Sequence, residues 1–300
     1  MNISMILKND SFVHTANLNS NPLYDILIDL QETKEILIDL GDKTYRDDRL
    51  YMTQFFAGVE LYKILFEKEY QKEAGITVEE VKMLNKVIEQ NSSIENNEYD
   101  KIVNDILQDQ VNEPYALLCC YLTNTLPFHA NTPNTLLNVR RELLLLTNDL
   151  QEFITACPLC FPNLYFHSNL VNTLRSLSAP FPKFKFEIIR HLTAINDIFH
   201  PLYKENRNGG INDILKVLKA EGELSCSLEG NAESARKRLT FEFKNKLDIY
   251  EELVCEPHTK LEGTGNPGDT EYKYDRIYFH GGKESIADGK TLIAHIGEHL

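Results

Sequence analysis

The C-terminal residues 270–300, TEYKYDRIYFHGGKESIADGKTLIAHIGEHL, decide how the rest of the chain is interpreted. Aromatic and β-branched residues fall in two runs, 272–279 and 292–296, and this composition is typical of strands. Between the runs lie Gly281-Gly282 and Asp288-Gly289, where the backbone can adopt a positive φ. The stretch therefore predicts a β-hairpin with a wide loop.

Length and charge restrict the classes of protein that fit. The chain has 300 residues, 42% of them apolar, so it can bury a large core and fits two domains. The formal net charge is −14, and residues 1–180 carry 14 Lys and Arg against 25 Asp and Glu. Neither half is a nucleic-acid-binding surface by bulk charge. No signal-like segment opens the chain and no apolar run approaches a membrane span of about 18 residues, so we expect a soluble, cytoplasmic protein without a membrane partner.

Helical spacing of apolar residues dominates the first half of the sequence. Asn21-Pro22, Thr77 with Glu80, and Thr132-Pro133 have the composition of helix N-termini. We expect helices that begin near residues 22, 47, 77, 100 and 132, the second of them running to about residue 72. The pattern predicts a helical first domain over residues 1–180.

The second half changes from a helical to a strand pattern. The proline-rich segment 157–183 is the expected domain boundary, so that the second domain spans residues 181–300. Helices are expected at about 186–205, 211–220 and 231–254, although the alternating residues 183–189, KFKFEII, also fit a strand. The fold class that follows is α+β and predominantly helical: a helical domain, then two or three helices packed on a small antiparallel sheet that ends in the β-hairpin.

Two cysteines have the spacing of a metal-binding pair. Cys157 and Cys160 have the C-x-x-C spacing that allows two thiolates to bind one zinc ion. His167 or Cys119-Cys120 would have to supply the remaining ligands. A zinc site of ordinary design has a second closely spaced pair, and adjacent cysteines on a helix project in different directions. We therefore expect these cysteines to pack in the interior, and we expect no metal and no cofactor.

Glu271-Tyr-Lys273 is an E-x-K motif on an expected strand. In this arrangement a carboxylate holds Mg²⁺ while the lysine on the same side helps to position the attacking water. Nucleases of this kind also need an Asp on a neighbouring strand, whereas the preceding segment here has a helical pattern. A metal-dependent nuclease is the third of our function hypotheses.

Acids, bases and a cation gather near the expected hairpin. Metal-independent RNA cleavage requires a base at the 2′-hydroxyl, a cation for the charge that develops on the phosphorane, and an acid for the leaving oxygen. Arg276 and four histidines, which can supply these functions, lie in or beside the hairpin; the histidines are His258, His280, His295 and His299.

The same residues resemble a known family. Arg276-Ile-Tyr-Phe279, Leu292-Ile-Ala-His295 and Glu298-His299-Leu300 are similar to the late strands of RelE-like toxins, small α/β ribonucleases of bacterial toxin–antitoxin systems in which helices precede an antiparallel sheet. Residues 257–261, PHTKL, resemble the short segment before that sheet. The resemblance implies that Arg276 is the phosphate-binding cation and His299 the general acid or base, with His258 as a third site residue.

The ending RIYFH…IAHIGEHL is also similar to the C-termini of uncharacterised bacterial proteins from phage-defence and mobile-element loci. Long helices without a complete catalytic motif, together with the acidic first half, favour a non-catalytic subunit or interaction protein of an antiviral-defence assembly, with a protein partner. The alternative is a metal-independent, RelE-like endoribonuclease in the C-terminal domain, which would contact nucleic acid there. Clustering of Arg276, His258 and His299 on an open face favours the ribonuclease, whereas burial favours a scaffold.

Overall fold

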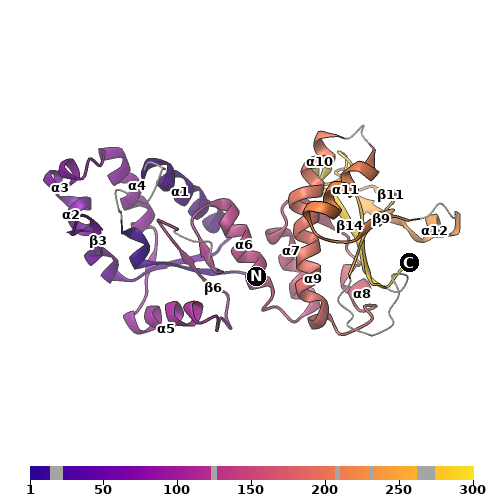
Figure 1. Cartoon of the computed structure of the whole chain (residues 1–300), viewed down its shortest axis with the longest axis horizontal. Helices are drawn as coiled ribbons and strands as arrows, with labels where there is room; N and C mark the ends of the chain where they lie inside the picture. The colour runs from indigo at the N-terminus through magenta and orange to yellow at the C-terminus, as the bar shows by residue number, and fades with distance from the viewer. Residues whose placement is uncertain (14–22, 123–126, 207–209, 230–232, 262–273) are drawn as a thin grey trace. The chain divides into compact units, whose positions relative to one another are not determined.

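The computed structural model describes residues 1–13, 23–122, 127–206, 210–229, 233–261 and 274–300. The chain divides into two compact units, Met1–Leu146 and Thr147–Leu300, and both mix helices with strands (Figure 1). The fold is therefore mixed α/β. Residues 157–183, the expected boundary, lie inside the second unit, where the end of α7 (Leu150–Cys160), β8 (Leu164–Phe166) and α8 (Leu170–Leu174) fall within the segment.

A parallel five-stranded sheet forms the centre of the first unit, which corrects the expectation of a helical domain. Its strand order is β5-β2-β1-β6-β7. The central strand β1 (Ser4–Leu7) pairs with β6 (Tyr115–Leu118) from Ser4 opposite Tyr115 to Leu7 opposite Leu118. Both strands are buried on both faces, so their sequences SMIL and YALL lack the alternation that marks a half-exposed strand.

Helices cover this sheet on both faces. The other strands are β2 (Lys43–Arg46), β5 (Ser92–Ser93) and β7 (His129–Ala130). Figure 1 shows α1 (Leu23–Asp39), α4 (Val78–Glu89) and α6 (Pro133–Leu144) on one face and α5 (Asn96–Leu107) on the other. The chain leaves β1 toward β2 and β5 on one side, and β6 and β7 lie on the other. The strand order therefore reverses between β1 and β6.

The prediction of one helix over residues 47–72 is wrong. A 3₁₀ turn, η2 (Asp48–Met52), leads into the hairpin of β3 (Gln54–Phe56) and β4 (Val59–Glu60), and α2 (Leu61–Phe66) and α3 (Lys68–Glu73) follow. Ala57 and Gly58 have φ angles of 46° and 85°, which a right-handed helix does not accept and a two-residue hairpin turn requires. The capping box of Thr77 with Glu80 and the helix start at Thr132-Pro133 are confirmed.

A mixed five-stranded sheet organises the second unit, in the order β8-β14-β13-β12-β9. The predicted C-terminal hairpin is confirmed as β13 (Arg276–His280) and β14 (Thr291–Gly297). β9 (Cys226–Leu228) and β12 (Pro257–Lys260) extend the sheet in antiparallel fashion, and β8 joins β14 in parallel. Every residue of β14 is buried, so the hairpin belongs to the core.

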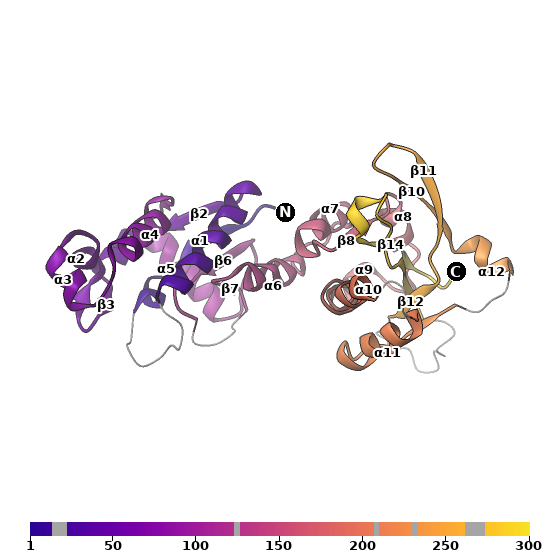
Figure 2. The same cartoon turned by 90° about the horizontal axis from the view of Figure 1, so that it is seen from above.

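Residues 183–189 are helical. α9 (Phe181–Ala194) continues through a π-helical turn, Ile195–Phe199, into α10 (His200–Glu205), and α11 (Ile211–Glu221) follows. These helices lie on one side of the sheet (Figure 2). Phe199 of the π-helical turn packs edge-on against Phe279 of β13, with ring centroids 4.8 Å apart. None of the described helices has the length and apolar composition of a membrane span.

The prediction of one helix over residues 231–254 is also wrong. This segment forms α12 (Glu233–Arg238) and a two-stranded arm of β10 (Thr240–Lys244) and β11 (Tyr250–Val254). Phe243 packs in one cluster with Leu292 and Ala294 of β14. The alternating residues of β10 supply this contact. Figure 2 shows the β10–β11 arm on the side of the sheet away from α9.

Candidate functional site

One carboxylate brings the three site residues expected from the sequence together. Glu229 directly follows β9, and its backbone N–H donates to the Glu256 carbonyl at 3.2 Å. Arg276 Nη1 donates to Glu229 Oε2 at 2.5 Å. His258 Nδ1 lies 3.5 Å from the same oxygen, and His299 Nε2 lies 3.6 Å from Oε1. We call these residues, with Tyr278, the Glu229 cluster.

Strand register explains why the side chains converge. His258 of β12 pairs with Ser227 of β9 and with Tyr278 of β13, and Tyr278 pairs with His295 of β14. Residues paired across strands share a face, so these four side chains form one row across the sheet. Arg276 precedes Tyr278 by two residues and therefore lies on the same face.

Tyr278 ties the cluster together. Its hydroxyl donates to Glu229 Oε2 at 3.2 Å and accepts from Arg276 Nη1 at 3.2 Å. His258 lies with its ring centroid 5.1 Å from that of Tyr278, and its Nε2 is 3.0 Å from Ser227 Oγ. One carboxylate oxygen is thus surrounded by an arginine, a phenol and an imidazole, while the other faces His299.

Burial is unequal within the cluster. Tyr278, His258 and Arg276 are almost completely buried, with exposed fractions of 0%, 1% and 5%. The side chains of Glu229 and His299 retain exposed fractions of 19% and 22%. Arg276 Nε is buried and has no hydrogen-bond partner among the described residues. Burial of Arg276 and His258 is what a scaffold would show, whereas the exposed parts of Glu229 and His299 are what a ligand would meet first.

Burial and charge set the protonation states. Burial, followed by the nearby Arg276 charge, lowers the pKa of His258 to about 4, so this imidazole is neutral at pH 7. Burial acts to raise the pKa of Glu229, but the charge of Arg276 is the main opposing cause and the pKa stays below its ordinary value. Burial also raises the pKa of Tyr278 to about 12. The cluster then combines an ionised carboxylate, a cation, a protonated phenol and a neutral imidazole.

The end of β14 positions His299. Glu298 N–H donates to Ser176 Oγ at 3.1 Å, and Ile296 N–H donates to Thr173 Oγ1 at 3.3 Å. A Cβ at Gly297 would lie 2.3 Å from Ser176 Oγ, so only glycine permits this close approach. Hydrogen bonds from the segment 173–176 therefore hold the strand end that carries His299.

The other histidines near the hairpin do not contact Glu229 among the described residues. His280 Nδ1 accepts from Gly282 N–H at 3.0 Å, and His295 Nε2 lies 2.9 Å from the Glu298 carbonyl, so both stabilise local loops. Glu271 and Lys273 lie outside the described residues.

The cysteine pair packs in the interior. Cys157 and Cys160 are buried in α7, and burial raises the pKa of the Cys157 thiol. His167 contacts the β10 backbone instead, with Nε2 3.2 Å from the Glu242 carbonyl. Cys119 and Cys120 follow β6 in the first unit and are not helical. The part of the chain that the structure describes holds no group of three or more His, Cys, Asp or Glu arranged for a metal ion.

Glu229 was not predictable from the local sequence. The residue follows a three-residue strand, Cys226–Leu228, which is too short for a period-2 pattern. Its partner Arg276 lies 47 residues further along the chain. The contact depends on the pairing of β9 with β12 and of β12 with β13, which no local signal reveals.

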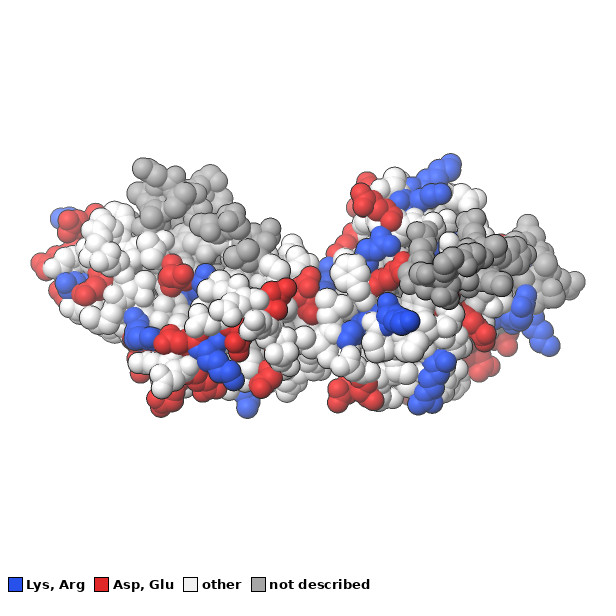
Figure 3. All heavy atoms as spheres, turned by 60° about the horizontal axis from the view of Figure 1, so that its bottom comes forward, with Lys and Arg blue, Asp and Glu red and all other residues white. Residues whose placement is uncertain are grey.

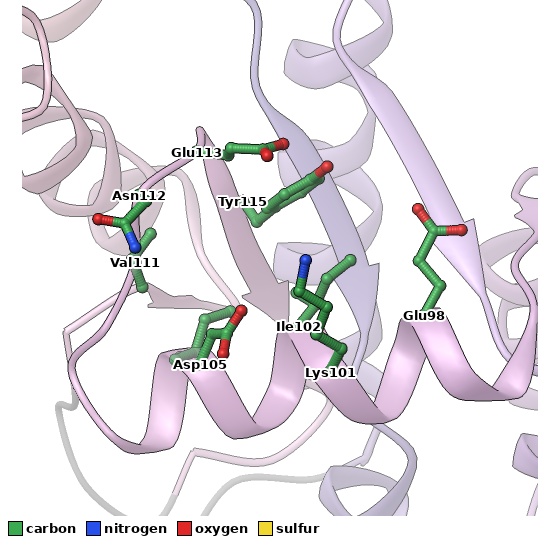
Figure 4. A pocket seen from close by; sticks show the side chains of 9 residues that line it. Glu98, Lys101, Ile102, Asp105, Val111, Asn112, Glu113 and Tyr115 are labelled. Carbon is green, nitrogen blue, oxygen red and sulfur yellow. The ribbon is translucent and has the colours of Figure 1, made fainter.

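A pocket of about 240 Å³ lies in the first unit, beside the start of β6. Glu98, Lys101 and Asp105 rise from α5 toward Glu113 and Tyr115 (Figure 4). A hydrogen bond to Glu113, with burial second, raises the pKa of Tyr115 to about 12. The charged residues that line this pocket are three carboxylates and one lysine. The excess of negative charge does not suit a phosphate ligand.

Comparisons of the chain with protein-family models, with curated proteins and with solved structures found no match. What the Glu229 cluster can do therefore follows from its chemistry. It contains a base, a cation and an imidazole at contact distances, and two of its members reach the surface.

Proposed function

We propose that the Glu229 cluster cleaves RNA without a metal ion. The observation that carries the proposal is the position of Glu229, which contacts Arg276 through Oε2 and faces His299 through Oε1 at 3.6 Å. The expected residues Arg276 and His299 keep the roles that the family resemblance implies, and Glu229 takes the role of general base. His258 is a neutral imidazole whose Nδ1 lies 3.2 Å from the Glu256 carbonyl and 3.5 Å from Glu229 Oε2, so it lines the carboxylate without taking part in proton transfer.

The reaction is a transesterification. Glu229 Oε1 takes the proton of a ribose 2′-hydroxyl, whose oxygen attacks the adjacent phosphorus as the bond to the 5′-oxygen breaks. Protonated His299 donates a proton to that leaving oxygen. The products carry a 2′,3′-cyclic phosphate and a 5′-hydroxyl. A phosphate that enters between Glu229 and His299 replaces their mutual contact with two contacts to substrate.

Arg276 contributes most in the transition state. Before reaction, the charge of Glu229 neutralises that of Arg276. When Glu229 takes the proton, this pairing weakens and the guanidinium charge becomes available to the phosphorane oxygens. An interaction that strengthens as the reaction proceeds is the kind that accelerates it.

Surface charge suggests a short binding footprint on RNA. On the face shown in Figure 3, Lys and Arg are interspersed with Asp and Glu. Affinity for nucleic acid rises with the number of phosphates that cations neutralise, and with it the salt dependence of binding. We therefore expect weak RNA binding with a shallow dependence on salt concentration.

Substitution of the base and the acid tests this function. Glu229→Gln and His299→Ala should each lower the cleavage rate by about 10²–10⁴-fold, because each removes one proton-transfer group. Glu298→Gln, an exposed carboxylate next to His299, is the matched control and should cleave like the intact chain. Equal rates for all three variants would contradict the proposal. Cleavage that requires a divalent metal would instead favour Glu271 and Lys273.

A second candidate function, an interaction protein of a bacterial defence-type assembly, is favoured by the tip of the β10–β11 arm. Leu247, Ile249 and Tyr250 at this tip have exposed fractions of 78%, 58% and 64%. Lys246 N–H donates to the Ser285 carbonyl at 2.9 Å, which anchors the arm to the hairpin loop. Clustered apolar residues on a protein surface commonly mark protein contacts.

Co-purification from the native host tests whether the β10–β11 arm binds a protein partner. A partner that co-purifies with the intact chain should be lost when Leu247→Ser and Ile249→Ser are combined, while the unfolding temperature stays unchanged. A partner retained equally by both proteins would exclude the arm as its binding site.

A further inference from the structure

The first unit carries another group of polar side chains, at the carboxyl end of its parallel sheet. Open parallel sheets commonly bind ligands outside the carboxyl ends of the strands, at the point where the strand order reverses. In this sheet the reversal lies between β1 and β6. Residues 8–11 follow β1, and Cys119 and Cys120 follow β6.

Hydrogen bonds fix these loops. Lys8 N–H donates to the Leu118 carbonyl at 3.0 Å, and Cys120 N–H donates to Ser11 Oγ at 3.0 Å. Asn9 N–H donates to the Tyr99 hydroxyl at 2.9 Å. The polar side chains at this edge are therefore held by the sheet and by α5.

Two buried polar atoms at this edge have no hydrogen-bond partner among the described residues: Asn9 Oδ1 and His129 Nε2. His129 Nδ1 lies 2.8 Å from the Pro127 carbonyl, which can only accept, so Nδ1 carries the hydrogen. Burial lowers the pKa of His129 and keeps the ring neutral. Nε2 therefore carries a lone pair. Neither Nε2 nor Asn9 Oδ1 accepts a hydrogen bond from the described residues.

Charged groups lie beside the two atoms. The Lys8 amine is 3.4 Å from the Asp10 carboxylate, and the charges of both act on His129. β6 separates β1 from β7, so the two strands lie about 10 Å apart. A ligand that spans the separation of β1 and β7 is larger than a water molecule.

We propose that this edge of the sheet binds a nucleotide, with Asn9 and His129 accepting hydrogen bonds from ribose hydroxyls or a base amine and Lys8 contacting a phosphate. The site lies in the first unit, so it is independent of the ribonuclease proposal. Buried acceptors without donors destabilise a fold, and they occur mostly where function requires them.

The test uses the full chain with ATP, GTP and NAD⁺ as probes in isothermal titration. We expect at least one to bind with a dissociation constant below about 1 mM. His129→Asn keeps a side-chain N–H for the Pro127 carbonyl and removes Nε2, and Asn9→Ala removes the other acceptor. Each should weaken binding about tenfold or more. Asn104→Ala, an exposed asparagine of α5, is the control and should bind normally.

Stability without nucleotide separates a binding role from a structural one. His129→Asn should not lower the unfolding temperature of the ligand-free chain, because the lost nitrogen makes no hydrogen bond there. A lower unfolding temperature with unchanged binding would assign His129 to the fold alone. Absence of binding for all three probes, or equal binding by His129→Asn and Asn104→Ala, would overturn the proposal.

Discussion

Arg276 Nη1 lies 2.5 Å from Glu229 Oε2, and this contact joins a buried cation to a carboxylate that reaches solvent. The pair connects β13 in the middle of the C-terminal sheet with the residue that follows its edge strand β9. It therefore stabilises the sheet and also presents a carboxylate of lowered pKa next to His299.

Loss of Arg276 should destabilise the second unit. Arg276→Ala leaves Glu229 without its cation partner in a partly buried position, which should reduce the free energy of unfolding by about 3 kcal/mol. Arg175→Ala, an exposed arginine of the same unit, should change it by less than about 0.5 kcal/mol. Urea denaturation of both variants measures the difference. Similar losses for both would mean that the Arg276 contact contributes little.

Acid should destabilise the folded chain through His258. Because its folded pKa of about 4 lies below the ordinary value of 6.5, the unfolded chain binds more protons between these values. Stability is full above about pH 6.5 and falls as the pH drops toward 4, by on the order of 2 kcal/mol from this group. His258→Asn should flatten this part of the curve, as urea denaturation at pH 7, 6 and 5 can measure. An unchanged slope in the variant would assign the acid sensitivity to other groups.

Removal of β14 should unfold the second unit. A chain that ends at Gly281 lacks Leu292, Ile293 and Ile296, all fully buried. Each buried side chain of this size contributes about 1.5–3 kcal/mol, and their sum approaches a typical stability margin of about 5–15 kcal/mol. Circular dichroism should show loss of a cooperative transition. A transition close to that of the intact chain would make the hairpin a dispensable addition.

Chelation should leave the fold unchanged. Cys157 and Cys160 are buried in α7 with the Cys157 thiol pKa raised, whereas zinc binds the thiolate form. Protein purified without chelator should contain far less than one zinc per chain by elemental analysis, and EDTA should not shift its unfolding temperature. A stoichiometric zinc ion would contradict this interpretation.

The C-terminal hairpin was predictable because its signals are local. Ile277 and Phe279 alternate with their neighbours in β13, and Gly282 and Gly289 adopt positive φ in the loop. The strands of the first unit gave no such signal: β1 and β6 have four residues each and are buried on both faces. Short continuous apolar runs do not distinguish a strand from part of a buried helix.

The misassigned segment 231–254 has a different cause. Leu239, Phe243 and Leu247 are spaced by four residues, and this spacing fits one face of a helix and one face of a strand equally well. In the structure Leu239 and Phe243 are buried, whereas Leu247 is exposed at the arm tip. The site shows the same limit: local patterns identified Arg276, His258 and His299, but Glu229 joins them through long-range strand pairing.

The most direct test of the proposed ribonuclease compares RNA with DNA of the same sequence, incubated with the full chain in EDTA. Attack by a 2′-hydroxyl predicts that RNA is cleaved to fragments with 2′,3′-cyclic phosphates, which mass spectrometry identifies, and that DNA stays intact. No cleavage of RNA, or equal cleavage of RNA and DNA, would contradict the proposed roles of Glu229, Arg276 and His299.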